Sequence, residues 1–247
     1  MPAYPLRALV LRKTKLGEAD LILTLLATDG RQVRAVAKGA RNPKSRFGAR
    51  SEPYTLLDLL LHTGRTLEVI AEARTVESHE ALRMDFDRAV HAAVVADLLD
   101  KASVEGQSDE RLYGLALASL DALEGAPVEQ LLSVTDAFLV KGMAMLGYRP
   151  QLSVCVECGA EAPAAFSLEA GGVVCASCAP LAAGVLRVGP DALLALGALL
   201  GARMAEVAGL GIPAAVQREC FTLLRAFVAT HVPARLKALE FLATELG

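Results

Sequence analysis

The sequence predicts an α+β protein of several domains, with a small barrel, a helical bundle and a four-cysteine ribbon inserted between helices. Three observations predict it. Five short runs rich in Val, Leu, Ile and Thr lie within residues 5–74, helix-spaced apolar runs follow, and two cysteine pairs interrupt those runs. The expected domains are the barrel at 1–78, the helical domain at 79–150 and 183–247, and the ribbon at 151–182.

The five expected strands fit a small closed barrel. Tight turns at 28–31 and 62–65 punctuate the runs, and five antiparallel strands in about 70 residues favour the OB-fold. Strand alternation should place Arg12 on the face of Val10 and Lys13 on the opposite face, and Arg34 and Lys38 on one shared face. The runs lie at 5–13, 19–28, 31–38, 54–63 and 66–74.

Apolar residues three or four positions apart predict that most of the remaining chain is helical. Gly125 and Gly147 stand where helices are expected to end, and Pro127 stands where a helix start tolerates proline. The expected helical runs are 78–102, 108–125, 127–148, 189–211, 212–232 and 232–247.

Charge is distributed unevenly along the chain. The net charge is −3, yet residues 1–50 contain eleven Lys or Arg against three Asp or Glu, a net charge of +8 that leaves −11 for residues 51–247. Such asymmetry indicates a polyanionic partner for the first segment. The most apolar stretch has 11 residues between Asp191 and Arg203, too short to span a bilayer, so we expect a cytoplasmic, nucleoid-associated protein without a membrane partner.

Four cysteines have the spacing of a metal site. Two residues separate the members of each pair, and Gly159 follows the first pair where a knuckle turn favours a positive φ. Four thiolates fill the coordination shell of Zn²⁺, which predicts a structural rather than a catalytic ion. Two disulfides are the alternative, and we expect Cys220 to pack as a small hydrophobic residue. The expected ligands are Cys155, Cys158, Cys175 and Cys178.

The loop at residues 38–50, "KGARNPKSRFGAR", is the candidate nucleic-acid contact. Five of its thirteen residues are cationic and none is acidic, and loops on small barrels commonly bind oligonucleotides. A solvated connector is the alternative, but the adjoining strands carry the same sign of charge. The expected DNA contacts are Arg12, Lys13, Lys15, Arg34, Lys38, Arg41, Lys44, Arg46 and Arg50.

No motif assembles a nucleophile with its base, so we expect no enzyme activity. The segment "GARNPKS" resembles a P-loop, but Pro43 stands where that motif needs a glycine N–H. Aromatic residues near the basic region are few, namely Tyr4, Phe47 and Tyr54. Phosphate contacts should therefore dominate, giving salt-sensitive binding of single- and double-stranded DNA with little sequence preference.

The order of these features resembles the RecO family of bacterial recombination mediators. The resemblance rests on "AVAKGARNPKS" at 35–45, "LGY" at 146–148 and "CVECG…FSLEAGGVVCASC" at 155–178, and it extends through nearly the whole chain. It implies a DNA repair protein that anneals complementary strands, engages single-strand-binding protein, joins a RecR-like partner and so helps to load the recombinase RecA.

Two other classes of function remain open at this point. A transcription-type protein would read nucleic acid with the ribbon, but residues 155–178 contain no Lys or Arg and three Glu. A zinc-dependent nuclease would need an open coordination position on the ion.

Overall fold

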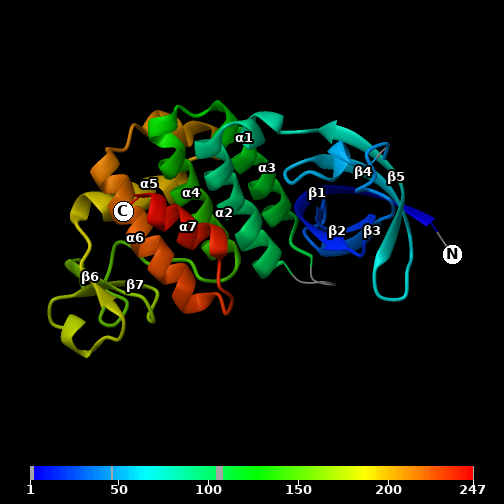
Figure 1. Ribbon diagram of the computed structural model, residues 1–247. Coiled ribbons are helices and arrows are strands. Elements are labelled where there is room, and N and C mark those ends of the chain that lie inside the picture. The colour runs from blue at the N-terminus through cyan, green and yellow to red at the C-terminus, as the bar shows by residue number, and fades with distance from the viewer. Residues whose placement is uncertain (1–2, 46, 104–107, 247) are drawn as a thin grey trace. The chain divides into compact units, whose positions relative to one another are not determined.

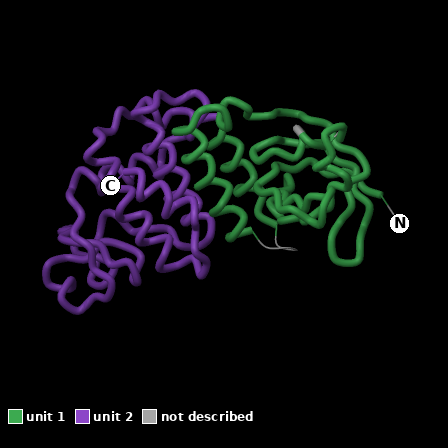
Figure 2. Tube along the Cα trace, in the orientation of Figure 1, with its two compact units in different colours: residues 1–120 green, residues 121–247 purple. Residues whose placement is uncertain are grey.

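The structure is a computed structural model that describes residues 3–45, 47–103 and 108–246 (Figure 1). The chain forms two compact units, residues 1–120 and residues 121–247 (Figure 2).

Five strands form a closed barrel in the first unit, in the order β1-β2-β3-β5-β4. Neighbours pair in antiparallel fashion except β3 and β5, which are parallel. This is the expected five-stranded OB-fold, although the prediction that all strands pair in antiparallel fashion was wrong for β3 and β5. All five strands overlap the expected runs, and β1 and β5 extend beyond them. The bounds are β1 Ala3–Leu16, β2 Asp20–Ala27, β3 Gln32–Ala37, β4 Leu56–His62 and β5 Glu68–Glu77.

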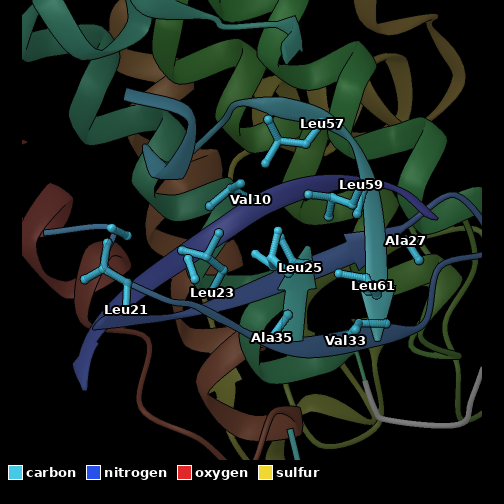
Figure 3. Packing of buried hydrophobic residues seen from close by; sticks show 14 residues of the cluster. Val10, Leu21, Leu23, Leu25, Ala27, Val33, Ala35, Leu57, Leu59 and Leu61 are labelled. Carbon is cyan, nitrogen blue, oxygen red and sulfur yellow. The ribbon is translucent and has the colours of Figure 1, made fainter. Parts of the chain in front are cut away.

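Alternate residues of the strands fill the barrel. Leu23 and Leu25 of β2 and Leu59 and Leu61 of β4 point toward one another in its interior (Figure 3). Their side chains are at most 4% exposed, which removes their apolar surface from water at about 25 cal/mol per Å². The barrel therefore has its own hydrophobic core.

A β-bulge in β1 reverses the expected faces. Val10 pairs with Leu25 and Lys13 pairs with Leu23, so the register shifts between Val10 and Arg12 and Leu11 is the extra residue. Paired residues share a face, so Lys13 lies on the face of Val10 and Arg12 on the opposite one. The prediction from strict alternation was wrong here, because one inserted residue shifts every later side chain to the other face.

Helices α1 (Glu80–Met84) and α2 (Phe86–Ala102) follow the barrel. The expected single helical run over 78–102 is broken at Asp85, which is extended and accepts a hydrogen bond at 3.0 Å from the N–H of Arg88. Helix α2 lies against β1, and helix α3 (Glu110–Gly125) leads into the second unit.

The second unit is a helical bundle in which α4 packs against α5 and α6. The expected helix over 189–211 is two elements, because Ala202 is extended and ends α5. No helix among the described residues combines the length and apolarity needed to cross a membrane. The bounds are η2 Val128–Gln130, α4 Leu131–Met145, α5 Pro190–Gly201, η4 Met204–Leu210, α6 Ala214–His231 and α7 Lys237–Leu246.

The ribbon lies between α4 and α5 in the chain, as expected. Strands β6 (Pro163–Ser167) and β7 (Gly172–Cys175) form an antiparallel hairpin, and β8 (Val185–Leu186) pairs with β6. The Gly-Gly turn is confirmed, with Gly171 at a φ of +74° that favours glycine.

Candidate metal centre and nucleic-acid interface

The four cysteines of the ribbon converge on one point. Their sulfur atoms all lie within 4.8 Å of one another, and the Sγ atoms of Cys158 and Cys175 are 3.7 Å apart. A disulfide needs a sulfur separation of about 2.05 Å, and all four cysteines are free thiols, which argues against the disulfide alternative. The cluster has the composition and spacing to hold a metal ion.

Tight turns place the sulfurs. The N–H of Gly159 donates to the carbonyl of Cys155 at 2.8 Å, and Gly159 has the expected positive φ, +77°. Backbone N–H groups also polarise the ligands, because the N–H of Cys175 lowers the pKa of the Cys155 thiol to about 6. The N–H of Cys178 likewise lowers the pKa of Cys175. By contrast, the side-chain hydrogen bond with Cys175 raises the pKa of Cys178 to about 12. The backbone therefore favours the thiolate, the form that binds metal, at Cys155 and Cys175.

The ribbon is fixed to the bundle by a contact that the sequence did not indicate. Nε2 of His231, at the end of α6, lies 2.8 Å from the carbonyl oxygen of Leu168 in the β6–β7 turn. The ring of Tyr148 stacks on His231 with centroids 4.6 Å apart. Phe166 of β6 meets Phe227 of α6 edge to face at 5.7 Å. One side of the hairpin therefore covers the cysteines and the other packs on α6.

The surface of the ribbon is unsuited to a polyanion. Glu157, Glu161 and Glu169 are exposed, and no Lys or Arg occurs between Cys155 and Cys178. The charge at this surface disfavours phosphate contacts near the cysteines.

Basic side chains gather instead on the barrel. Thr24 of β2 pairs with Arg12 on one side and with Arg34 on the other, so these three residues form one row across three strands. The row lies on the outer face, because the neighbouring positions Leu23 and Leu25 point into the core. Adjacent strands are about 4.8 Å apart, which places the two arginine Cα atoms about 10 Å from each other.

Lys13 and Lys15 project from the opposite face of β1. Their side chains lie on the same face of the sheet as Leu23 and Leu21. They are nevertheless exposed, because β4 pairs with β1 only as far as Leu9 and does not cover this end of β1. Nζ of Lys13 lies 2.5 Å from the carboxylate of Glu52, which follows the basic loop. The structure thus brings Lys13 next to the end of that loop.

Hydrogen bonds fasten the basic loop to the β1–β2 turn. The N–H of Gly39 donates to Oδ1 of Asp20 at 2.7 Å, and the N–H of Arg41 donates to the carbonyl of Ala19 at 2.9 Å. Nη1 of Arg41 donates to the carbonyl of Gly17 at 2.8 Å. The exposed side chains of Lys38 and Lys44 are therefore carried on a hydrogen-bonded backbone.

Most of the expected DNA contacts are not neutralised by an acid. Arg12 has Asp100 at 3.3 Å and Lys13 has Glu52, whereas Arg46 lies outside the described residues. The other six have no carboxylate within ion-pair distance among the residues that the structure describes. They are Lys15, Arg34, Lys38, Arg41, Lys44 and Arg50.

The aromatic residues near this surface are buried or partly buried. Tyr4 and Phe47 pack against the barrel core, and Tyr54 is only 8% exposed. Sequence reasoning left out Arg31 and Arg65, which line a hollow beside Arg34. Arg65 carried no signal in the sequence, because it stands alone in a turn outside the basic loop.

Comparison with known proteins gives matches along nearly the whole chain. The family model described as "Recombination protein O N terminal" matches residues 1–79, and "Recombination protein O C terminal" matches residues 83–240. The chain is 35% identical over 248 residues to DNA repair protein RecO of Bifidobacterium adolescentis, covering 98% of this chain and 100% of the relative. It is 37% identical to DNA repair protein RecO of Frankia casuarinae, covering 98% and 99%, and 37% identical to that of Rubrobacter xylanophilus, covering 100% and 98%.

Proposed function

This chain belongs to the recombination protein O family of DNA repair proteins, and from that premise we propose that it is a DNA-binding recombination mediator. In this role it binds single- and double-stranded DNA mainly through phosphates, with residues 1–78 as the DNA-binding domain. It anneals complementary strands and catalyses no chemical step.

The observation that carries the proposal is the group of six cations on the barrel that have no carboxylate partner among the described residues. Cations already held by acids gain little from a phosphate, whereas unpaired cations gain a charge-assisted contact and release counterions from DNA. Because Tyr54 is buried and Tyr4 and Phe47 are partly buried against the core, base stacking adds little affinity. Binding should therefore depend weakly on sequence and strongly on salt.

Annealing follows from the same electrostatics. Two complementary strands repel each other through their phosphates, and a surface dense in Lys and Arg lowers that repulsion while both strands are held. The second unit carries more acidic than basic residues and is left for protein partners. Family resemblance supports a RecR-like protein and single-strand-binding protein as partners, and through them the loading of the recombinase RecA.

We also propose that the cysteine cluster holds one structural Zn²⁺ through Cys155, Cys158, Cys175 and Cys178. A tetrahedron with Zn–S distances of about 2.3 Å has edges of about 3.8 Å, and the sulfurs of Cys158 and Cys175 are 3.7 Å apart. Four thiolates leave no position for water or substrate, so the ion stabilises the fold of the ribbon and performs no hydrolysis.

Fluorescence anisotropy against salt tests the proposal. The variant carrying Lys38→Glu, Arg41→Glu and Lys44→Glu removes about three phosphate contacts. For single strands, the plot of log K against log salt should therefore become shallower, its negative slope shrinking in magnitude by about 2. The matched control reverses three exposed arginines of the second unit, Arg187, Arg218 and Arg235. Equal affinities for the loop variant and the unaltered chain would refute the placement of the DNA site.

A further inference from the structure

A polar hollow of about 220 Å³ lies where β3 and β5 begin. It is lined by Arg31 and Arg34 of the β3 region, by Arg65 and Glu68 at the start of β5, and by Tyr4 of β1. About 10–15 Å³ of such space is enough for one water molecule, so the hollow has ample room for a solvated anionic group.

The charge of the hollow favours an anion. Arg34 and Arg65 are exposed and have no carboxylate partner among the described residues, whereas Arg31 is held by Asp29 at 2.9 Å. Glu68 is the acid that lines the hollow, and its Oε2 atom is buried below the surface. That atom has no hydrogen-bond partner among the described residues, so the charge of Glu68 opposes an anion, but three arginines line the same hollow. Guanidinium groups bind phosphate oxygens in a planar, bidentate manner.

The hollow and the basic loop lie at the two ends of β3. Arg34 points outward from the strand near its start, and Lys38 directly follows its last residue, Ala37. Four residues at about 3.3 Å each separate the two Cα atoms by about 13 Å. Unpaired cations thus occur along the strand from the hollow to the loop.

We propose that this hollow binds a backbone phosphate of a single-stranded nucleic acid, through Arg34 and Arg65, and that the strand continues along β3 to the basic loop. The inference rests on the proposed function and adds Arg65 as a binding residue. A single strand fits this path because its flexible backbone can bend into a recess between β3 and the β4–β5 loop.

Anisotropy with a fluorescent single-stranded oligonucleotide and the full chain tests the assignment. Arg65→Gln removes one contact. The magnitude of the slope of log K against log salt should fall by about 0.7, and the affinity should fall about fivefold at roughly 0.1 M salt. The matched control is Arg74→Gln on β5, where Arg74 is also exposed but lies 2.6 Å from Asp58. This control should change the affinity less than twofold.

The outcomes separate this inference from the proposed function. If Arg65→Gln and Arg74→Gln weaken binding equally, or if Arg65→Gln binds like the unaltered chain while the loop variant is impaired, the hollow is not a phosphate site and the proposed function stands. If the unaltered chain does not bind DNA, both fail. An equal loss of affinity on a blunt duplex would overturn the assignment to a single strand.

Discussion

Arg12 of β1 and Arg34 of β3 stand in one cross-strand row, on either side of Thr24 of β2. Their charges differ in availability, because Nη1 of Arg12 lies 3.3 Å from Oδ2 of Asp100 whereas Arg34 has no carboxylate partner among the described residues. The same Oδ2 atom also lies 2.7 Å from Nζ of Lys101, so Asp100 of α2 is shared between two cations. Under the proposed function, Asp100 would compete with DNA for Arg12.

Replacing Asp100 with Asn should tighten DNA binding. The change removes the carboxylate that Arg12 and Lys101 share. Each cation that then reaches a phosphate should raise the affinity up to about fivefold at roughly 0.1 M salt and steepen the salt dependence by up to about 0.7. Anisotropy titrations measure both quantities. Glu110→Gln, which removes an exposed carboxylate from α3, is the control and should leave binding unchanged. Weaker binding by the Asp100 variant would show that the pair supports the site instead of competing with it.

Replacing Cys155 with Ala should release the metal ion and lower the melting temperature. Three thiolates hold the ion less tightly, and the ribbon loses the link between its two turns. Metal content by elemental analysis and thermal unfolding measure the effect. Cys220→Ala is the matched control, since Cys220 is also buried but lies in α6 outside the cluster, and it should keep one equivalent of metal. Full metal retention by the Cys155 variant would disprove the ligand assignment.

Replacing His231 with Ala should loosen the ribbon without emptying the cluster. The change removes the contact to Leu168 and the stacking on Tyr148, which together contribute about 1–3 kcal/mol. We expect a lower melting temperature with one equivalent of metal retained. Thr230→Ala, at the exposed neighbouring position, should have little effect. Loss of the metal in the His231 variant would show that α6 is needed to form the site.

Asp136 should make the second unit less stable as the pH rises. Both of its carboxylate oxygens are buried without a hydrogen-bond partner, and burial raises its pKa well above the ordinary value. The unfolded chain loses this proton near pH 4 while the folded chain keeps it, so the free energy of unfolding falls as the pH increases beyond that point.

Asp136→Asn removes this ionisation, so the melting temperature of the variant should exceed that of the unaltered chain at pH 8 and approach it near pH 4. Thermal unfolding at several pH values measures the difference, with the exposed Glu245→Gln as control. A variant that is destabilised equally at both pH values would indicate that the carboxyl group makes a contact that the amide cannot replace.

Local patterns were enough to predict most elements. The five strands, the Gly-Gly hairpin and the turn at Gly159 follow from short-range signals: strand-forming residues between turns, and glycines where φ is positive. The helical runs were predicted less accurately at their breaks. Asp85 and Ala202 adopt extended conformations inside apolar patterns that continue past them, and periodicity alone does not report such interruptions.

The amino-acid sequence by itself determined the five strand-forming runs, the metal-binding spacing of the cysteines and the concentration of positive charge in the first fifth of the chain, because each depends on neighbours in the chain. Only the tertiary structure decided which charges are available. The bulge at Leu11 sends Arg12 and Lys13 to faces opposite to those expected, Asp100 neutralises one arginine, and the β4–β5 loop brings Arg65 beside Arg34. These relationships join residues tens of positions apart, and strand register and packing set them.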